Sequence, residues 1–315
     1  MKQLIHYATM APSGHNTQPW KFRIQQQMIC ICPDLSRRLP VVDPFDRELY
    51  ISLGCAVENL VIAARHTGHT ASVGKTLEDG TVPVKIGPAD GTPDNEGLFD
   101  AIPKRQSTRR QYDGKPIPED DMERLASLPL EQGVAVLFVT DPKKTEAIIS
   151  LVREGNHIQM HDRDFMQELI SWIRFNETEA DRFRDGLSSK ASGSPSVPRF
   201  IGKFFMRYLL NADIQSKKDE KYIRSSSALM VLLSENNDRD SWIRTGRSFE
   251  RLVLCATSLG IKNAHINQPC EVPELRKQLQ ELLSVDDLHP QLLLRIGYAQ
   301  PLPGSLRRPV SEVII

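Results

Sequence analysis

Apolar and polar residues along this chain follow two distinct periods. In residues 47–67 the apolar positions recur every three or four residues, which is the spacing of one buried face of an amphipathic helix. Gly68 follows directly and is suited to end that helix. In residues 81–86 apolar and polar side chains alternate, which is typical of a half-buried strand. The chain therefore predicts a mixture of helices and strands.

The same two patterns predict further elements along the chain. Helices are expected at residues 2–10, 119–125, 142 to about 157, 242–259 and 275–283, and strands at residues 20–24, 28–32, 134–140, 226–233 and 291–297. Residues 155–221 are charged and irregular, and they include a loop rich in Ser, Gly and Pro at 188–197. This stretch is interpreted as an insertion.

Two of the predicted helices resemble each other in sequence. Residues 51–68 and 243–260 align without a gap, with the matched pairs Ile51/Ile243, Gly54/Gly246, Glu58/Glu250, Leu60/Leu252, Val61/Val253, Ala64/Ala256 and Gly68/Gly260. Amphipathic helices can align by chance, but apolar periodicity does not require paired glycines and glutamates. We therefore favour an internal duplication of two similar α+β units. Residues 89–97, rich in Pro, Gly, Asp and Asn, are the expected boundary, giving units 1–98 and 99–315.

Composition and charge narrow the classes of function. The 315 residues include 40 Lys and Arg and 40 Asp and Glu, so the neutral total gives no electrostatic case for nucleic acid or an anionic membrane as the main partner. No apolar run approaches the ~20 residues of a membrane-spanning helix, and the N-terminus lacks a signal-peptide pattern. Five scattered cysteines argue against a disulfide framework. A cytoplasmic protein is expected.

The first segment with candidate chemistry is Ala-Pro-Ser-Gly-His-Asn-Thr-Gln-Pro-Trp at residues 11–20. In the simplest interpretation, Pro12 and Gly14 merely break the chain between a helix and a strand. The side chains of Ser13, Asn16 and Gln18 also offer both donors and acceptors. Such a set suits a heterocycle that displays both, as the pyrimidine edge of a flavin does.

The second segment is Arg-Gln-Ser-Thr-Arg-Arg-Gln-Tyr at residues 105–112. A basic run of this kind is most often a solvated surface. Arg105 and Ser107 would nevertheless bring a guanidinium and a hydroxyl close together, as a phosphate site requires. Arg307 and Arg308 form a second basic pair, which can reach the same phosphate only if the fold brings the two segments together.

The other candidate motifs give weaker evidence about function. His157 and His161 have the spacing of metal ligands on a helix, but neither an HExxH pattern nor a third ligand accompanies them, so a solvated helix face is favoured. No metal site is predicted. The chain contains no GxGxxG, GxxxxGK or GxSxG, so nothing supports a Rossmann cofactor site, a P-loop or a hydrolase nucleophile elbow.

Together the motifs resemble those of the nitroreductase-like flavoproteins. PSGHNTQPW is similar to the PSxxNxQPW signature of that family, RQSTRRQY to its RxSxR segment, and RIGYAQPLPGSLRRPVSEVI to its C-terminal strand and basic tail. LPVVDPFDRELYISLGCAVENLVIAA, ELISWIR and Asn267-Gln268-Pro269 resemble the Acg-like branch, in which two family units are fused. The resemblance covers nearly the whole chain. It implies a nitroreductase-like α+β fold of two fused units, each a mixed or antiparallel sheet flanked by helices.

The resemblance also implies a place for a flavin. In the family's common homodimer, FMN lies between a subunit that provides RxSxR and the basic tail and a subunit that provides PSxxNxQPW. In this chain the first unit carries only PSxxNxQPW, and the second carries only RxSxR and the tail. The two units would therefore complete one FMN site per chain. The implied cofactor-binding residues are Ser13, Gly14, Asn16, Arg105, Gln106, Ser107, Arg109, Asn267, Gln268, Pro269, Arg307 and Arg308.

Particular roles follow from the same resemblance. Arg109 would lie near flavin N1, where a cation stabilises the negative charge of the reduced ring. A backbone amide within residues 267–271 would face N5, although Val272 stands where the family usually has glycine. The inserted stretch is expected to form a lid that brings Trp172, Phe200, Phe204 or Tyr208 above the ring, with a plain surface excursion as the alternative.

Three hypotheses about function follow. The first is an oxidoreductase in which FMN takes hydride from NADH or NADPH and reduces a nitroaromatic or quinone-like acceptor; it needs no catalytic side chain. The second is a non-catalytic protein that binds or sequesters FMN beneath a lid. The third is a relic of the fold that no longer binds FMN. A fused pair already buries the family's dimer interface, so both a monomer and a homodimer are compatible with the sequence.

Overall fold

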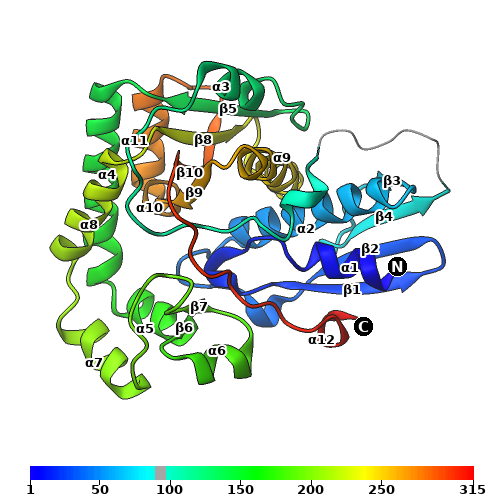
Figure 1. Ribbon diagram of the computed structural model, residues 1–315, viewed down its shortest axis with the longest axis horizontal. Helices are drawn as coiled ribbons and strands as arrows, with labels where there is room; N and C mark the ends of the chain where they lie inside the picture. The colour runs from blue at the N-terminus through cyan, green and yellow to red at the C-terminus, as the bar shows by residue number, and fades with distance from the viewer. Residues whose placement is uncertain (89–96) are drawn as a thin grey trace.

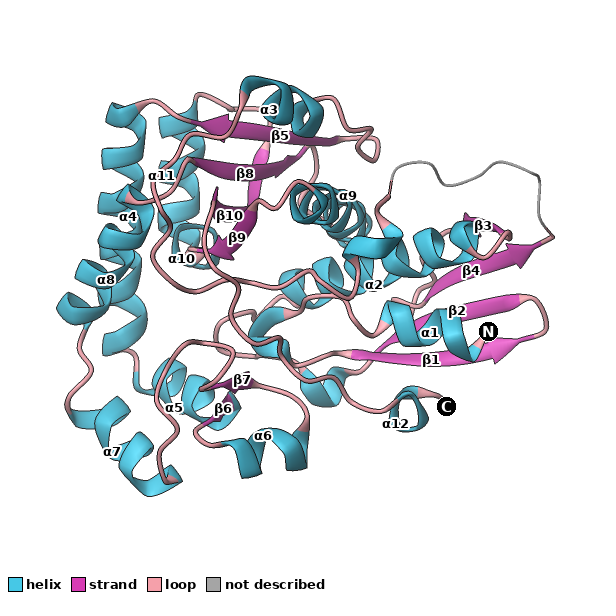
Figure 2. Ribbon diagram, in the orientation of Figure 1, coloured by secondary structure: helices cyan, strands magenta, loops and turns pink. Residues whose placement is uncertain are grey.

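The computed structural model describes residues 1–88 and 97–315. Two four-stranded antiparallel sheets lie on opposite sides of a central pair of long helices, α2 (Arg47–His66) and α9 (Arg239–Ser258), as Figure 1 shows. In Figure 2, where helices are cyan and strands magenta, a layer of helices lies beside the second sheet. Helices and antiparallel sheets together confirm the predicted α+β class.

The first sheet is formed by residues from the N-terminal part of the chain. Its order is β1-β2-β4-β3, with every neighbouring pair antiparallel. The elements of this part are α1 (Lys2–Ala8), η1 (Gly14–Asn16), β1 (Trp20–Gln25), β2 (Met28–Pro33), η2 (Leu35–Arg37), β3 (Thr70–Val73), β4 (Val82–Gly87) and η3 (Phe99–Ala101).

The second sheet has the order β5-β8-β10-β9, again with antiparallel neighbours. Its elements and their flanking helices are α3 (Glu119–Ala126), β5 (Val134–Val139), α4 (Pro142–His161), β8 (Ala228–Ser234), β9 (Lys262–His265), α10 (Gln268–Glu271), α11 (Pro273–Leu283), β10 (His289–Gly297) and α12 (Val310–Val313). In each sheet two strands precede the central helix and two follow it, and the four are ordered alike. This likeness supports the proposed duplication.

Alternate side chains of the second sheet enter different cores. In β8, Met230 and Leu232 belong to the apolar cluster around α2 and α9, whereas Val231 and Leu233 belong to the cluster beneath α4 and α11. A strand that is apolar on both faces fits this position between two helical layers. The sheet is therefore covered by apolar layers on both sides.

The two central helices meet at the glycines that the sequence alignment pairs. A side chain at Gly54 would collide with the carbonyl of Ile243, and one at Gly246 would collide with the carbonyl of Ile51. The contacts are reciprocal, because the alignment matches Gly54 with Gly246 and Ile51 with Ile243. Such self-complementary packing is typical of a two-fold interface between like units. It supports, from geometry, the duplication proposed from sequence.

Most of the inserted stretch forms a small body at the lower edge of the molecule in Figure 1. This body contains α5 (Arg163–Trp172), β6 (Ile173–Arg174), α6 (Glu177–Phe183), β7 (Leu187–Ser188) and α7 (Arg199–Tyr208). The last helix of the stretch, α8 (Ala212–Arg224), packs alongside α4 instead. β6 and β7 pair in parallel as a separate two-stranded sheet. The C-terminal tail, red in Figure 1, then crosses from β10 to the N-terminal part of the chain, where Phe22 pairs with Ile314.

All the predicted long elements are found, with ends that differ by a few residues. The strands β3 and β9 were not predicted, because four residues with partly polar faces give too short an alternation to detect. Most of the boundary expected at residues 89–97 lies outside the described residues. Within the described residues, no helix combines the length and apolarity that crossing a bilayer requires.

Candidate functional site

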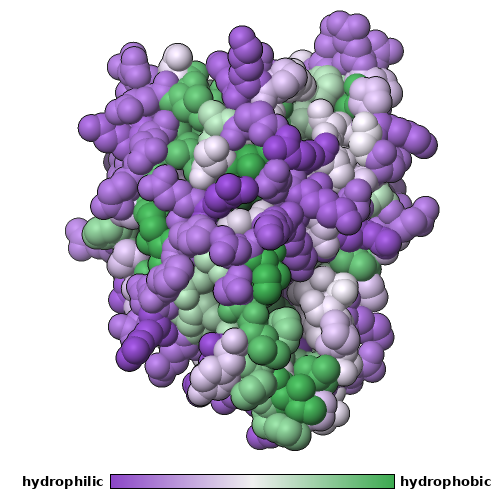
Figure 3. Space-filling view, turned by 90° about the vertical axis from the view of Figure 1, so that its left-hand side faces the viewer, coloured by the Kyte–Doolittle hydropathy of each residue, from purple (hydrophilic) through white to green (hydrophobic). Residues whose placement is uncertain are grey.

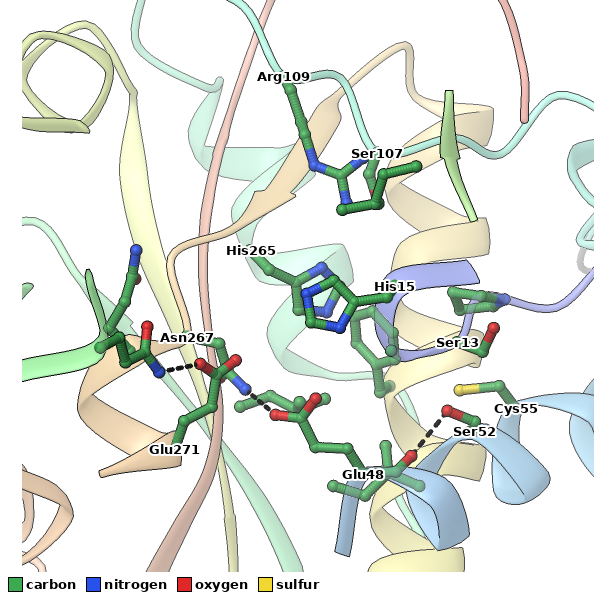
Figure 4. Close-up of a pocket in the computed structure, with 18 of the residues that line it drawn as sticks. Ser13, His15, Glu48, Ser52, Cys55, Ser107, Arg109, His265, Asn267 and Glu271 are labelled. Atoms are coloured by element: carbon green, nitrogen blue, oxygen red, sulfur yellow. Dashed lines mark hydrogen bonds between the residues drawn. The ribbon is translucent and has the colours of Figure 1, made fainter. Parts of the chain in front are cut away.

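Two adjoining cavities lie where the two parts of the chain meet. The larger is about 260 Å³ and the other about 200 Å³. Both are lined by Pro12, Ser13, Ser107, Arg109 and Leu187, so they form one elongated pocket. The sequence analysis assigned Ser13 to the first unit and Ser107 to the second, and the fold brings them to the same cavity. Figure 4 shows the larger cavity.

The wall from the first unit is a strained loop. His15, Asn16 and Gln18 all have positive φ angles, a conformation that residues other than glycine seldom adopt. Side-chain hydrogen bonds hold it. The Ser13 hydroxyl accepts from the Gln18 backbone amide at 2.9 Å, and the Gln18 amide donates to the carbonyl of Arg184 at 2.8 Å. The loop is therefore fixed to the insertion as well as to its own strand.

The wall from the second unit is the segment that carries Ser107 and Arg109. Ser107 pairs with Asn263 as an isolated β-bridge, which adds the segment to the edge of β9. The fully buried Arg295 of β10 donates to the carbonyl of Arg110 at 2.8 Å and lies 4.0 Å from the centre of the Tyr112 ring. Arg295 thus holds the backbone on both sides of Arg109, whose side chain faces the cavity (Figure 4).

The two arginines of the tail have different surroundings. Arg307 lines the smaller cavity and donates to the carbonyls of Met10 and Ala11, both at 3.1 Å. Arg308 lines neither described cavity. Its guanidinium instead donates to the carbonyls of Gln18 and Trp20, at 2.9 and 3.1 Å. Of the predicted pair, Arg307 is at the pocket and Arg308 fastens the tail to the start of β1.

The smaller cavity has the electrostatics of an anion site. Arg105, Arg109 and Arg307 line it, and none of its lining residues is acidic. The fully buried Glu250 lies 3.5 Å from Nε of Arg105, and three guanidiniums against one carboxylate leave a positive excess. Burial and the neighbouring Arg105 lower the pKa of Arg307 to about 9. An anion bound in the cavity would counter the charge of Arg105 and so raise the pKa of Arg307 again.

Two buried histidines lie in the middle of the larger cavity (Figure 4). Burial, and then the charge of Arg109, lower the pKa of His15 to about 4. Burial, followed by Arg109 and Arg105, lowers the pKa of His265 to about 3. Both rings are therefore neutral at neutral pH, and Arg109 is the nearest fixed positive charge. The sequence analysis did not single out either histidine.

Carboxyl groups gather at the end of the larger cavity opposite Arg109 (Figure 4). Glu48, at the first turn of α2, accepts a hydrogen bond from the Asn267 amide. Glu271 accepts one from Gln159 at 2.6 Å. Burial, and then the charge of Glu271, raise the pKa of Glu48 to about 7, while Arg47 opposes the shift. Burial likewise raises the pKa of Glu271.

The insertion covers the pocket through Phe165, Leu187 and Ala191. Phe165 and Leu187 line the larger cavity, and Leu187 and Ala191 line the smaller one. The aromatic residues expected above the ring do not line either cavity. Trp172 packs between Arg37 and Arg174, with their guanidinium carbons 5.3 and 5.7 Å from its centre. The prediction erred because aromatic content alone does not tell which face of a helix turns inward.

The predicted cofactor-binding residues differ in their relation to the pocket. Those that line it are Ser13, Gly14, Asn16, Arg105, Gln106, Ser107, Arg109, Asn267, Gln268 and Arg307. Pro269 is buried within α10 and is not among them. The Asn16 amide is already engaged, because it donates to the carbonyls of Gly186 and Leu306 and accepts from Arg307.

Several pocket residues gave no sequence signal. Glu48, Cys55, Gln159, Phe249 and His265 all line the larger cavity. The hydrogen bond between Glu48 and Asn267 joins residues 219 positions apart, so no local pattern could reveal it. Cys55 is a buried thiol whose pKa is raised well above its ordinary value by burial, and it donates to the carbonyl of Gly246 at 3.3 Å.

The remaining candidate motifs are structural. His157 lies 3.3 Å from a carboxylate oxygen of Asp213, and His161 bonds the carbonyl of His157 at 2.7 Å. Among the described residues, no three His, Cys, Asp or Glu side chains gather closely enough to hold a metal ion. The pair therefore stabilises the surface of α4 next to α8.

Comparison with known proteins finds relatives named as nitroreductases that match the chain over its full length, in agreement with the resemblance of its motifs. A Mycobacterium tuberculosis protein named "Putative NAD(P)H nitroreductase Rv3131" is 28% identical over 323 residues, covering 100% of this chain and 90% of the relative. A second, "Putative NAD(P)H nitroreductase acg" of the same organism, is 25% identical over 325 residues, covering 99% and 94%. No family model matches the chain.

Solved structures of the same class are also similar, at lower identity. The FMN-dependent nitroreductase NfnB from Mycobacterium smegmatis, solved in complex with NADPH, shares 15% identity and covers 69% of this chain and 96% of its own, with a TM-score of 0.44. A nitroreductase from Bacteroides fragilis with bound FMN shares 20% identity, covers 64% and 88%, and has a TM-score of 0.37.

Proposed function

We propose that this protein is an FMN-dependent NAD(P)H oxidoreductase with its flavin site in the pocket between the two units. The observation that carries the proposal is the pocket's polarity: three arginines and no acid line one end, two neutral histidines lie in the middle, and two buried carboxyl groups lie at the other end. FMN has the matching shape and charge, a phosphate joined through a flexible chain to a polar ring. The names of the full-length relatives support the NAD(P)H-dependent reaction.

A buried donor without a hydrogen bond supports this assignment. Nε of Arg307 is buried without a hydrogen bond to any described residue, and Nε of Arg105 has an ion pair with Glu250 at 3.5 Å but no hydrogen bond. Buried polar atoms are rarely left unpaired unless a ligand or water satisfies them. The residues present therefore fit an anionic phosphate beside Arg105 and Arg307, with the Ser107 hydroxyl as a further donor.

When bound, FMN would supply the redox chemistry, accepting a hydride from NADH or NADPH and passing electrons to an acceptor. The chain's own residues would bind, orient and set the electrostatics. Arg109 holds a fixed positive charge in the pocket, which favours any ligand whose negative charge increases on reduction. The His15 and His265 rings add donors or acceptors without adding charge. A nitroaromatic or quinone-like acceptor suits this chemistry.

The part of the molecule related to this site by the duplication is differently built. Glu58, the sequence equivalent of Glu250, accepts hydrogen bonds from Arg247 at 3.0 Å and from Arg251 at 2.6 Å. Both arginines also pair with Glu131, at 2.6 and 3.1 Å. Two acids and two arginines satisfy one another there, so no positive excess remains for a phosphate. This supports one FMN per chain.

The direct test is anaerobic reduction of the flavin-loaded protein by NADH and by NADPH. We expect at least one of them to bleach the flavin absorbance, and a nitroaromatic or quinone to restore it. Retained absorbance with both donors would overturn the oxidoreductase. A protein that stays colourless after mixing with FMN and desalting would overturn the flavin site itself.

A second candidate function is FMN binding without turnover. The observation that favours it is the cover formed by Phe165, Leu187 and Ala191 over both cavities. A lid that does not open would hold the flavin away from nicotinamide and acceptor. Deletion of residues 188–197 should then make reduction of the bound flavin faster, whereas unchanged reduction kinetics would contradict a blocking lid.

A further inference from the structure

Helix α7 turns an apolar face to the solvent instead of to the protein. Its exposed side chains include Phe200, Phe204 and Tyr208, which are 74%, 56% and 71% exposed. Ile201, Phe205 and Leu209 add to the same face, with exposures of 46%, 48% and 53%. Figure 3 shows hydrophobic atoms gathered toward the lower end of the molecule, where α7 lies in Figure 1. The patch is separate from the candidate pocket, because no residue of α7 lines either cavity.

The sequence of α7 arranges this face in rows. Positions four apart lie on one side of a helix, so Phe200, Phe204 and Tyr208 form one row and Ile201, Phe205 and Leu209 the next. On the other side of the aromatic row, Arg199, Lys203 and Arg207 form a row of cations by the same spacing. An apolar stripe bordered by a basic one is the pattern of helices that lie in a membrane interface.

The attachment of α7 leaves the apolar rows free. Gly202 is the buried residue of the helix, and a side chain there would overlap the ring of Phe175. The small residue lets the helix approach the insertion by its backbone. Arg199 reinforces the contact by pairing with Glu179 at 3.0 Å. None of the rows of large apolar residues is needed for this packing, so their exposure has another cause.

The charge around the patch indicates its partner. Residues 186–211 contain Lys190, Arg199, Lys203 and Arg207 and no acidic residue. Lys190 and Arg199 are balanced by Glu177 and Glu179 of α6, at 3.3 and 3.0 Å. Lys203 and Arg207 form no ion pair with any described residue and carry the unbalanced positive charge of this surface. Two copies of the chain meeting through α7 would bring these like charges together, which is unfavourable. An anionic lipid surface would neutralise them while receiving the aromatic side chains.

We propose that α7 docks the protein on anionic lipid bilayers, with its aromatic rows at the acyl boundary and Lys203 and Arg207 among the headgroups. The helix lies along the surface and does not cross it. Apolar burial and basic charge act together, and neither alone gives stable attachment of a single short helix. The neutral total charge of the chain conceals this local basic and aromatic surface. The proposal does not depend on the flavin site.

The test is co-sedimentation of the flavin-loaded protein with vesicles. One set contains phosphatidylcholine alone, and the other contains equal parts of phosphatidylcholine and phosphatidylglycerol. We expect binding to the mixed vesicles only, weakening as salt is raised. The double variant Phe204→Ser, Tyr208→Ser should lose binding to the mixed vesicles. Phe45→Ser is the matched control, because Phe45 is 75% exposed but lies outside α7, and it should bind as the parent does.

A second set of variants distinguishes the contribution of charge to vesicle binding from that of apolar burial. Each of Lys203→Gln and Arg207→Gln should weaken binding to the mixed vesicles by about five-fold. Flavin absorbance retained by every variant shows that the fold is intact. The proposal is overturned if the parent does not sediment with mixed vesicles, or if the α7 variants sediment equally well. A concentration-dependent dimer that the double variant abolishes would also overturn it, by showing that α7 contacts a second copy.

Discussion

Arg307 links three parts of the pocket, because its guanidinium reaches the carbonyls of Met10 and Ala11 and the side chain of Asn16. Its Nε is left for a ligand. The tail that carries it follows β10, while Asn16 belongs to the first unit. One side chain thus joins the two units and completes the anion cavity, which makes it the sharpest single probe of the site.

Replacing Arg307 should weaken the binding of FMN. We expect Arg307→Ala to raise the Kd by about tenfold to a hundredfold, since a charge-assisted contact to phosphate is lost. Flavin fluorescence titration measures this, with circular dichroism to verify the fold. Arg110→Ala is the control, because Arg110 belongs to the same basic segment but is exposed and lines neither cavity. Equal loss in both variants would contradict a specific contact.

Glu48 should make the stability of the protein depend on pH. Its pKa is raised from 4.5 to about 7 by burial and Glu271, so between those values the folded state keeps a proton that the unfolded state has released. Stability therefore falls as pH rises through this window. Glu48→Gln removes the effect while keeping the acceptor for Asn267. The variant should gain on the order of 1–3 kcal/mol relative to the parent between about pH 5 and pH 8.

Urea unfolding of both proteins at the two pH values checks this expectation. Titration of Glu250, His15 and His265 is common to parent and variant, so it largely cancels in the difference. Asp43 and Glu271 interact with Glu48, so the difference measures how this group of carboxyls titrates together. The exposed Glu154→Gln serves as a control and should give no pH-dependent gain. A stability difference that stays constant with pH would show that Glu48 is ionised throughout the window.

At the residue scale, the sequence was informative where chemistry is encoded in short motifs. Ser107, Arg109 and Arg307 were predicted and lie at the pocket. Arg308 was predicted beside Arg307 but points to the carbonyl of Gln18, because neighbouring residues in an extended tail face opposite ways. His265 was missed because it lies on a four-residue strand whose facing residues are set by tertiary contacts.

Among the helices and strands, the packing of α2 against α9 depends most on a single residue type, glycine. Glycine ordinarily weakens a helix by about 1 kcal/mol relative to alanine. At Gly54 and Gly246, however, an added methyl group would strike the carbonyl of the facing helix. This collision should make alanine destabilising at these positions, because backbone atoms cannot move aside as the end of a side chain can.

Gly246→Ala should consequently destabilise the protein despite its better helix propensity. We expect a loss of about 1–3 kcal/mol in the free energy of unfolding, measured by chemical denaturation. Gly304→Ala provides the comparison, because a side chain there would meet nothing within 4 Å. A Gly246→Ala variant as stable as the parent would mean that the helices can separate slightly without loss of packing.

Element boundaries were predictable where periodicity runs long. The 20 residues of α2 and the 20 of α9 were both found, and the alignment between them identified the glycines at their contact. The insertion was predicted as a lid but its contacts were not. Phe200 and Tyr208 are apolar enough to suggest inward packing, yet Gly202 turns the opposite face of α7 to the protein.

For the whole molecule, the order of strands is the same in both sheets, yet the two potential sites differ. One has a surplus of arginine around Glu250, and the other has Glu58 and Glu131 balanced by Arg247 and Arg251. No single motif predicts this asymmetry. The asymmetry depends on which of the two proposed units carries each motif. The sequence shows that placement of motifs once the chain is divided into two units.

The asymmetry predicts a stoichiometry. The flavin-saturated and desalted protein should contain one FMN per chain, determined from flavin absorbance and protein concentration. Arg247→Gln should leave that ratio unchanged, because Arg247 belongs to the balanced cluster. A ratio approaching two would show that both sites bind flavin and would contradict the proposed division of labour between the units.

The tail that carries Arg307 and Arg308 has a consequence for biosynthesis. Both arginines bind backbone carbonyls of residues 10–20, and those residues leave the ribosome long before the arginines do. Folding of the N-terminal sheet can begin early, as is usual during synthesis. The anion cavity cannot close until Arg307 has left the ribosome. Acquisition of FMN is therefore expected to follow emergence of this tail, so a nascent chain stalled before Arg307 would remain without its cofactor.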